Sequence, residues 1–477
     1  MIGAGAVSLM APVAQTRGAT APAPVPFASL QESFEGRVIA RGARTFEKTR
    51  QSLIWNKYLP SGRSPDAIVL VTSANDVAAA VRFANKNRLK IAMRSGGHSY
   101  HAAPLRNGGL LLDMGTLSHI RVDTKARRAS VEPGAKSGEL MAELAPLGLA
   151  FPVGHCSDVA MGGYLLGGGL GWNFGEWGPS CMSVVGMQMV TAAGEVIYAD
   201  ASQNADLYWA ARGAGRGFFA AVTRYDLQLY SLPSSMRSLS MAFALDSALN
   251  VADWLDRAIS TVHPTVEVIC SLIPPGPAGP PLIAVSAFAM TEVPSAATAH
   301  FGSLTEPPPE LGRVGQVEER AVSFEELLQL TDSGFPSGKR MAGDNRFSNS
   351  SLRELVAATR QLIPKGPAAP SGVAFIVLGG RSLPPRAADV AYSTGGQVDI
   401  GTYAFWDKPA EDAANRDWVR SVMRAVEPLS IGGYISETDL ATQPGLAAKC
   451  FSPEAWSRLA ALKREHDPED RFYGYEA

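Results

Sequence analysis

A histidine placed directly after two glycines is the first feature of this sequence that could do chemistry. The segment reads Arg94-Ser95-Gly96-Gly97-His98-Ser99-Tyr100. Adjacent glycines let backbone N–H groups approach an anion closely, and the arginine supplies a fixed positive charge beside them. The histidine is then held against whatever the turn binds. Taken alone, the segment is explained more simply as a tight turn with a surface histidine.

A cysteine that precedes an unusual density of glycine is the second such feature. Cys156 is followed by Val159 and then by six glycines within ten residues, namely Gly162, Gly163, Gly167, Gly168, Gly169 and Gly171. Glycine costs backbone entropy, so this density indicates a backbone wrapped closely around a ligand or another backbone. By composition alone, a buried structural thiol is the more common role for Cys156.

Apolar runs place the histidine at the end of a predicted strand. Residues 67–71 and 89–93 are short apolar runs, and Ser73 and Asn75 offer caps for a helix between them. This strand–helix–strand unit ends at the glycine pair, and ligands commonly bind at the carboxyl ends of strands in such units. Further strands are predicted at 110–114, 129–134, 184–191, 196–199 and 221–230, and helices at 138–147 and 206–211.

From about residue 236, proline-rich breaks separate the predicted elements. Strands are expected at 282–289, 373–378 and 397–406, and helices at 248–261, 323–330, 350–362 and 415–425. We interpret this region as a second α+β domain built on an antiparallel sheet. A final helix is expected at 453–466.

The bulk composition fits two globular domains and excludes several classes of partner. The chain has 477 residues, 46% hydrophobic and 18% charged, with a net charge of −2 and no long basic run. This charge argues against a nucleic-acid or anionic-membrane partner. The four cysteines form no CxxC pair, so no metal site is expected.

The first thirty residues are expected to be a leader or tail. Residues 2–14 are small and apolar, and Ala19-Thr20-Ala21 is typical of a signal cleavage site, although a basic n-region is missing. Export to the periplasm or the medium is therefore favoured over a cytoplasmic location. Gly3-Ala4-Gly5 follows no strand, which argues against a dinucleotide loop. No other segment is long and apolar enough to span a bilayer.

The features taken together resemble a known family. The string 94–100, Leu111-Leu112-Asp113-Met114, Cys-x-x-Val-x-x-Gly-Gly at 156–163 and the closing Asp467-Pro468 are similar to FAD-linked oxidases of the berberine-bridge-enzyme-like group. That group belongs to the vanillyl-alcohol-oxidase superfamily, whose FAD-binding domain is called PCMH-type. The resemblance covers roughly residues 50–232 and the last thirty. It implies an α+β fold with a possible tail at 1–30, an FAD-binding domain at 31–235, a substrate domain at 236–439 and a returning segment at 440–477.

The resemblance also implies a covalently held cofactor. In this family the loop histidine bonds to the flavin 8α carbon and the cysteine to C6, which here are His98 and Cys156. Covalent attachment fixes the ring and raises its reduction potential. Val159 matches a position where a small side chain leaves room for O₂, which favours an oxidase. The remaining expected cofactor-binding residues are Arg94, Ser95, Gly96, Gly97, Ser99, Tyr100, Gly162, Gly163, Gly168 and Val222.

Two departures from the family pattern put contacts to the adenosine end of FAD in doubt. Where relatives usually read Gly-Gly-Asn-Phe-Gly, this chain has Phe218 in place of the Asn and Ala220 in place of the last Gly. These changes bear on the adenosine contacts and leave the expectation of FAD intact.

The expected catalytic base is Tyr434, which lies where relatives carry Tyr-x-Asn, with Ser436 replacing the Asn. A tyrosine acts as a base when its pKa is lowered. Alternation in 397–406 puts Gln397, Asp399 and Tyr403 on one strand face, which either roofs the flavin or faces water. Glu437 is a weaker candidate base, and Tyr434 is alternatively a half-buried strand tyrosine.

The sequence therefore predicts an FAD oxidase that removes a hydride from a small organic alcohol or secondary metabolite and reduces O₂ to H₂O₂. A mostly apolar substrate is favoured over a long sugar. Two alternatives stay open: a flavin dehydrogenase that uses a quinone or protein acceptor, and a catalytically degenerate flavin-binding protein.

Overall fold

The computed structural model describes residues 25–32, 34–277, 279–378 and 388–475. Most of the expected leader lies outside these ranges. The first helix, α1 (Phe27–Glu32), packs on β1 and α3, and Leu30 is buried among their apolar side chains. The folded part thus includes residues that precede residue 31.

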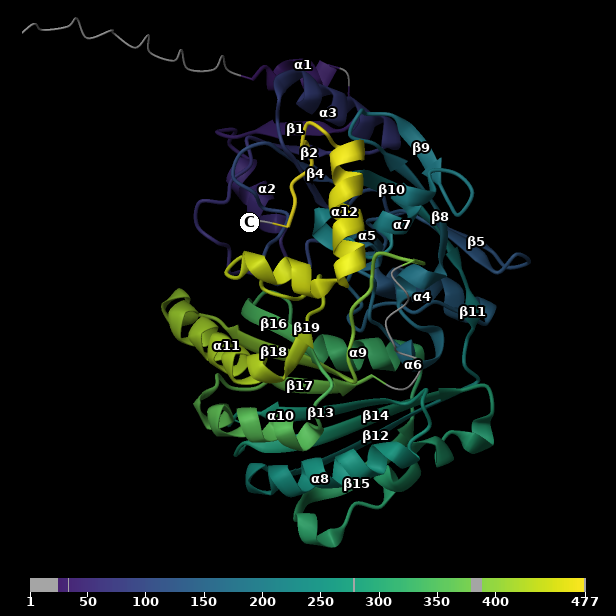
Figure 1. The fold of residues 1–477 in the computed structure, drawn as a ribbon, viewed down its shortest axis with the longest axis vertical. Helices are drawn as coiled ribbons and strands as arrows, with labels where there is room; N and C mark the ends of the chain where they lie inside the picture. Colours follow the sequence, from purple (N-terminus) through teal and green to yellow (C-terminus); the bar gives the residue numbers. More distant parts are fainter. Residues whose placement is uncertain (1–24, 33, 278, 379–387, 476–477) are drawn as a thin grey trace, which may run out of the picture.

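Two sheets build the amino-terminal half, which occupies the upper part of Figure 1. In the first sheet, parallel strands β2, β4 and β3 carry the antiparallel strand β1 at one edge. The second sheet is antiparallel, in the order β5-β6-β10-β8-β9. The strands are β1 (Arg37–Ala40), β2 (Ala67–Leu70), β3 (Ile91–Arg94), β4 (Leu110–Asp113), β5 (Ile120–Asp123), β6 (Arg128–Val131), β8 (Val184–Val190), β9 (Val196–Ala199) and β10 (Ala221–Gln228).

Short helices surround these sheets. Ser73 caps α3 (Ala74–Asn87), as its sequence predicts, and the apolar face of that helix packs into the core with β2 and β4. A two-stranded sheet pairs β7 (Leu149–Ala150) with β11 (Tyr230–Ser231). The other helices here are α2 (Phe46–Ser52), α4 (Ser137–Leu144), α5 (Met161–Leu166), α6 (Phe174–Trp177) and α7 (Ala205–Ala211).

One antiparallel sheet of eight strands dominates the lower half, in the order β15-β12-β14-β13-β17-β18-β16-β19. This sheet confirms the expected α+β fold class with an antiparallel second domain. Its strands are β12 (Ser235–Ala244), β13 (Glu267–Ile273), β14 (Leu282–Thr291), β15 (Arg313–Ala321), β16 (Arg340–Ser348), β17 (Gly372–Val377), β18 (Val398–Trp406) and β19 (Ser430–Gly432). Five of them, β12, β13, β15, β16 and β19, were not among the predicted strands.

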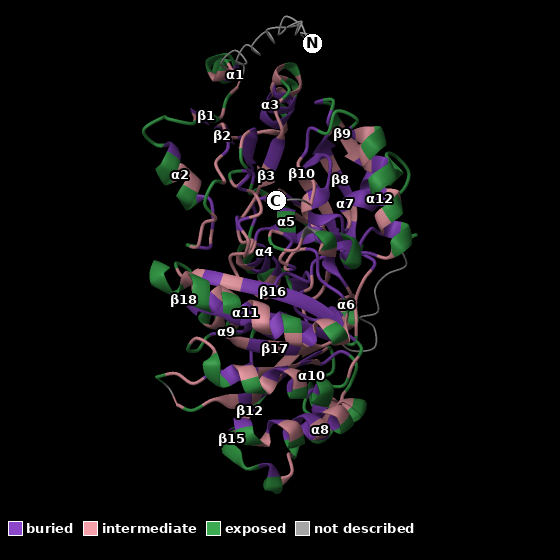
Figure 2. Cartoon of the chain, turned by 60° about the vertical axis from the view of Figure 1, so that its left-hand side comes forward, coloured by how far each residue is buried: buried purple, intermediate pink, exposed green. Residues whose placement is uncertain are grey.

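Helices cover one face of this sheet and leave the other face toward the amino-terminal half. Alternate side chains such as Val268, Cys270 and Leu272 of β13 pack against α8 (Ala248–Ala258), α10 (Leu352–Thr359) and α11 (Asp412–Val426). Figure 2 shows β16 buried along most of its length, whereas the outer surface of α8 is exposed. Helix α9 (Phe324–Gly334) lies on the inner side and contacts α4.

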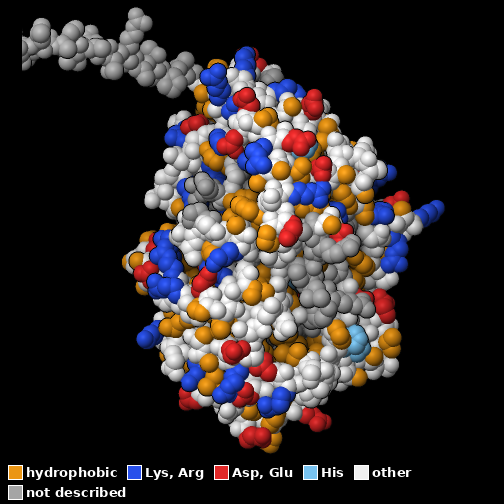
Figure 3. All heavy atoms as spheres, viewed as in Figure 1, with side chains coloured by type: hydrophobic (Ala, Val, Ile, Leu, Met, Phe, Trp, Pro, Cys, Tyr) orange, Lys and Arg blue, Asp and Glu red, His pale blue; other side chains and the backbone are white. Residues whose placement is uncertain are grey.

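The carboxyl-terminal segment returns to the first sheet. Helix α12 (Pro453–His466), yellow in Figure 1, contacts α7, and the backbone of Ile91 bonds to that of Arg471 and Tyr473. The face shown in Figure 3 carries basic and acidic side chains interspersed. Within the described ranges, no helix is both long and apolar enough to cross a bilayer.

Candidate active site

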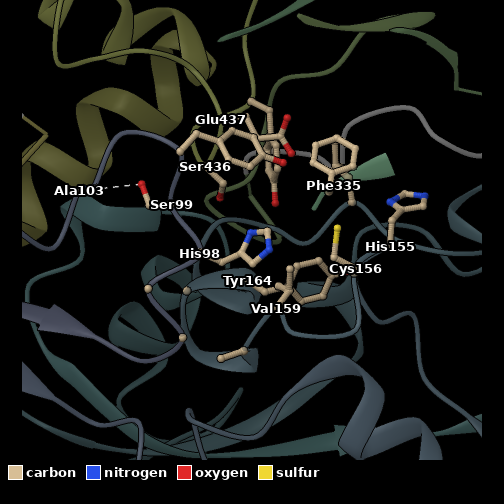
Figure 4. Close-up of a pocket in the computed structure, with 18 of the residues that line it drawn as sticks. His98, Ser99, Ala103, His155, Cys156, Val159, Tyr164, Phe335, Ser436 and Glu437 are labelled. Atoms are coloured by element: carbon tan, nitrogen blue, oxygen red, sulfur yellow. Dashed lines mark hydrogen bonds between the residues drawn. The ribbon is translucent and has the colours of Figure 1, made fainter. Parts of the chain in front are cut away.

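A cavity of about 740 Å³ lies where the two halves meet. One wall consists of the loop after β3 and the segment 154–172, and the opposite wall consists of β13, β14, β17 and β18 together with residues 434–437. Figure 4 shows the side chains of Glu437 and Phe335 across this space from those of His98 and Cys156. The structure therefore brings together the two residues that the sequence singled out.

The loop after β3 is braced by an arginine that the sequence analysis assigned to a ligand. Nη1 of Arg94 pairs with Asp113 at 2.9 Å, while Nε donates to Leu53 O and Nη2 to Gly96 O, both at 2.9 Å. These three contacts engage one N–H of each guanidinium nitrogen. Arg94 thus holds the loop in shape, and it also lines the cavity. The parallel pairing of β3 with β4 sets Arg94 beside Asp113.

His98 is held by an aromatic ring and a carboxylate. Its imidazole stacks on Trp55 with ring centroids 4.5 Å apart, and its Nε2 lies 2.9 Å from Oδ1 of Asp158. The two atoms are close enough for an electrostatic contact, although Nε2 has no hydrogen-bond partner of good geometry among the described residues. Burial would raise the pKa of Asp158, but the contact with His98 and the charge of Lys136 outweigh burial and lower it.

Cys156 lines the same cavity as a free, buried thiol. Burial raises the pKa of Cys156, and the charges of Asp158 and Asp332 raise it further. The thiol is therefore protonated at neutral pH in this environment. The other three cysteines, Cys181, Cys270 and Cys450, are also buried free thiols.

Three of the expected glycines form part of the wall because no side chain fits there. A Cβ on Gly96 would lie 2.6 Å from Cβ of Ala160, and one on Gly162 would lie 2.7 Å from Oγ of Ser95. Gly97 has φ +71°, and a Cβ there would collide with Leu53 O. Gly168 is outside the wall and packs against Tyr392, which corrects its assignment to the cofactor. The remaining expected residues, Ser95, Ser99, Tyr100, Val159, Gly163 and Val222, line the cavity.

Two buried guanidinium groups supply positive charge to the cavity. Arg106 donates to Gly474 O at 3.0 Å, and Arg216 donates to Thr438 O at 3.2 Å. Burial lowers the pKa of each to about 10, and for Arg106 the neighbouring charge of Arg216 contributes. Nε of Arg216 is buried and has no hydrogen-bond partner among the described residues. Phe218, by contrast, is buried in the core beside Phe219, away from the cavity.

Acidic and phenolic groups face the cavity from the substrate-domain wall. The hydroxyl of Tyr403 donates to Glu437 Oε2 at 3.1 Å, and the Asn345 amide donates to Asp399. Burial raises the pKa of Glu437. Burial also raises the pKa of Asp399, and the charge of Glu437 raises it further. Two interpretations were open for the polar face of residues 397–406, namely that it faces the flavin or that it faces water. Asp399 and Tyr403 line the cavity, which agrees with the first.

Two other expected catalytic residues, Gln397 and Tyr434, are placed differently from each other. Gln397 is exposed, precedes β18 and does not line the cavity. Tyr434 does line it, but its hydroxyl accepts a 3.0 Å hydrogen bond from the Gly169 N–H, and burial raises its pKa. A phenolate base requires the opposite shift. The backbone N–H of Tyr434 is held by Asn345 Oδ1 at 2.8 Å, so the ring has a fixed position.

Sequence reasoning missed several residues in or beside the cavity: Arg106 and Arg216 line it, whereas Asp158 and Trp55 contact His98. Asp158 stands inside the quoted Cys-x-x-Val motif, but nothing in the sequence indicates that it reaches His98. Trp55, Arg106 and Arg216 carry no pattern that marks them. A second missed contact is His155 Nε2 to Glu267 Oε1 at 2.8 Å, which joins the two walls. Among the described residues, no group of three or more His, Cys, Asp or Glu side chains could hold a metal ion.

Comparisons with known proteins indicate that the cofactor of this site is FAD. Residues 65–200 match the family model described as "FAD binding domain". The chain is 27% identical over 419 residues to the FAD-linked oxidoreductase nodO of Hypoxylon pulicicidum, covering 87% of this chain and 92% of that protein. It is 28% identical over 424 residues to (R)-6-hydroxynicotine oxidase of Paenarthrobacter nicotinovorans, covering 86% and 90%.

Solved structures give the same fold. The crystal structure of 6-hydroxy-D-nicotine oxidase from Arthrobacter nicotinovorans superimposes with a TM-score of 0.77 at 25% identity, covering 93% of this chain and 97% of that one. BBE-like 1 of Physcomitrella patens matches with a TM-score of 0.79 at 20% identity, covering 94% and 98%. The fold and the cavity thus define a two-domain flavoprotein. The chain contains an FAD-binding domain at residues 65–200 and is similar along most of its length to FAD-linked oxidoreductases.

The residues present fit FAD. The glycine wall admits a close approach of backbone to ligand, and the charges of Arg106 and Arg216, including the unpartnered buried Nε, suit the negative diphosphate. His98, Cys156 and Val159 would then meet the flavin ring, with Tyr403 and Glu437 on its substrate side. When bound, FAD supplies hydride acceptance and electron transfer to a second acceptor.

Proposed function

We propose that the protein is an oxidase that holds FAD through covalent bonds to His98 and Cys156 and uses O₂ as the electron acceptor. The observation that carries this proposal is the convergence of that imidazole and that thiol, from two separate segments, on one cavity. Each bond replaces a flavin C–H and a protein N–H or S–H. For each bond formed, two electrons and two protons are released, and they reduce one O₂ to H₂O₂.

We propose that Glu437, hydrogen-bonded to Tyr403, accepts the substrate's proton during oxidation. Its carboxyl lies on the substrate-domain wall, and its raised pKa brings it nearer to neutral, where a general base works best. Tyr434, whose hydroxyl already accepts a hydrogen bond, positions the wall by its contacts with Gly169 and Asn345. This assignment replaces the tyrosine base expected from the sequence.

The substrate proposed is a small, mostly apolar alcohol or related metabolite. The inward face of β13 and β14 offers Ile269, Ser271, Ile273, Ser286 and Phe288, which present apolar surface with isolated hydroxyls. Such a surface orients a compact substrate by few polar contacts. It offers little of the dense hydrogen bonding that a long sugar requires.

An amine is a second candidate substrate, because two buried carboxyl groups, Asp399 and Glu437, face the cavity. A bound cation would compensate their repulsion. The relative that is named a 6-hydroxynicotine oxidase is consistent with this possibility. Matched alcohol and amine substrates, compared under the same conditions, separate the two classes.

The experiment that tests the function is acid precipitation of the purified protein, followed by peptide mass spectrometry and an oxygen-electrode assay. We expect the yellow colour to stay with the pellet and flavin to be found on peptides that contain His98 and Cys156. After anaerobic reduction, the flavin should reoxidise in air with formation of H₂O₂. Flavin that is lost to the supernatant contradicts covalent attachment, and reduced flavin that persists in air favours the dehydrogenase alternative.

A further inference from the structure

We propose that Asp158 is a positioning residue for covalent attachment: it directs bond formation to Nδ1 of His98 and favours the histidine over the neighbouring cysteine. The proposal rests on the covalent attachment proposed above. It starts from one contact, the 2.9 Å between His98 Nε2 and Asp158 Oδ1.

The contact fixes which nitrogen of the imidazole is nucleophilic. A neutral imidazole carries its proton on one nitrogen and a lone pair on the other, and a carboxylate beside Nε2 favours the proton there. The lone pair then lies on Nδ1. Trp55 holds the ring plane by stacking on it, and the backbone N–H of Trp55 donates to Gly97 O at 3.0 Å, which ties the stack to the glycine loop.

The carboxylate also stabilises the charge that develops as the bond forms. Bonding of a neutral imidazole through Nδ1 makes the ring positive until the Nε2 proton leaves. Asp158 lies where it compensates this charge and accepts the proton. Overall, one C–H bond of the 8α methyl and the imidazole N–H are exchanged for a C–N bond. Two electrons and two protons pass to O₂ and yield H₂O₂.

The same carboxylate acts in the opposite sense on Cys156. A thiol becomes nucleophilic only as the thiolate. The negative charge of Asp158, only two residues away, disfavours that form, as does Asp332, whose carboxylate accepts hydrogen bonds from the N–H and hydroxyl of Ser157 at 2.9 and 2.5 Å. Asp158 thus favours attachment at His98 and opposes it at Cys156. A purely structural side chain would not have effects of opposite sign at two sites.

The test measures attachment at each site separately. Full-length protein is produced under riboflavin starvation and given FAD in air, and peptides bearing His98 and Cys156 are quantified over time by mass spectrometry. In Asp158→Asn we expect attachment at His98 to slow at least about tenfold, whereas attachment at Cys156 is unchanged or faster. Asp158→Glu should restore much of the rate at His98. The linkage isomer in the wild-type peptide should be Nδ1.

The matched control is Asp332→Asn, which removes a carboxylate of α9 that is hydrogen-bonded to Ser157 of the same loop and does not touch His98. It should leave attachment at His98 unchanged. Wild-type attachment at His98 in Asp158→Asn overturns the proposal, and so does a bond through Nε2, which requires no variant to detect. If the wild-type protein binds FAD but carries none on His98, the proposal of covalent attachment itself is wrong. If FAD is attached to His98 at the normal rate in Asp158→Asn, only the role proposed for Asp158 is wrong.

Discussion

The two walls of the cavity are built by different means. The wall expected to hold FAD consists largely of backbone, with glycines where a Cβ would collide, and Arg94, paired with Asp113, holds its loop by hydrogen bonds to backbone carbonyls. The opposite wall consists of side chains that project from an eight-stranded antiparallel sheet. A backbone wall tolerates little change, whereas a side-chain wall can alter its chemistry one residue at a time. This contrast explains how related folds keep one cofactor and vary the substrate.

The largest expected effect comes from Gly97→Ala, which tests the rigidity of the backbone wall. At φ +71° an alanine is strained by about 1–2 kcal/mol, and collision of its Cβ with Leu53 O adds about 1–3 kcal/mol. We expect the loop to shift, His98 to move from Asp158, and the flavin content of the purified protein to fall sharply. Absorbance at the flavin and protein bands gives that ratio, and chemical denaturation gives the stability.

Gly178→Ala is the matched control for this prediction. Gly178 has the same φ of +71°, but a Cβ at this position would have no neighbouring atom within 4 Å. The Gly178→Ala protein should therefore be destabilised by the backbone strain alone and should keep its flavin. Equal flavin loss in both variants would mean that strain, and not the close approach of the wall, determines cofactor binding.

The second prediction concerns the side-chain wall. Glu437→Gln should lower turnover by about 10²–10⁴-fold, because the amide cannot accept a proton. Burial raises the pKa of Glu437, and only its carboxylate form acts as base, so wild-type kcat/KM should fall as pH decreases through this raised pKa. The acid limb should then lie above the ordinary pKa of about 4.3. Stopped-flow reduction of the flavin across pH measures it.

Tyr403→Phe sharpens the same prediction. The Tyr403 hydroxyl stabilises the Glu437 carboxylate and so lowers its pKa against the effect of burial. Removal of the hydroxyl should move the acid limb to higher pH and leave the rate at alkaline pH largely intact. A Glu437→Gln variant that retains the wild-type acid limb would assign the base to another group, with Asp399 the nearest candidate on the same wall.

The contrast between the walls also decides what the sequence could predict. The backbone wall leaves a visible pattern, because close approach demands glycine, and His98, Cys156 and Val159 stand at fixed places in that pattern. The partner of Arg94 could not be foreseen, since Asp113 meets it only through the parallel register of β3 and β4. Gly168 was misassigned because a glycine packed on Tyr392 looks the same in sequence as one packed on a ligand.

Prediction was weaker for the sheet. Strand β16 lies inside the sheet, between β18 and β19, yet it contains Asp344, Asn345 and Arg346 in succession, and no alternation marks it. Its charges are buried because Arg346 pairs with Asp344 at 3.0 Å and with Glu427 at 2.8 Å, contacts that exist only in the folded chain. The alternation predicted strand β18, but it did not show at which residue the strand begins. Gln397 was therefore assigned to the strand, which starts one residue later, at Val398.

The smallest expected effect tests the boundary between the walls, where O₂ is proposed to reach the flavin. Val159 lines the cavity and packs against the core of the amino-terminal half. Val159→Ile adds one methylene there and should slow reoxidation by O₂ about tenfold, equivalent to about 1.4 kcal/mol, while reduction by substrate is unchanged. Val222→Ile adds the same methylene elsewhere in the cavity and should spare reoxidation. Because the two half-reactions are measured separately by stopped flow, a Val159→Ile protein that reoxidises at the wild-type rate would show that O₂ reaches the flavin by another route.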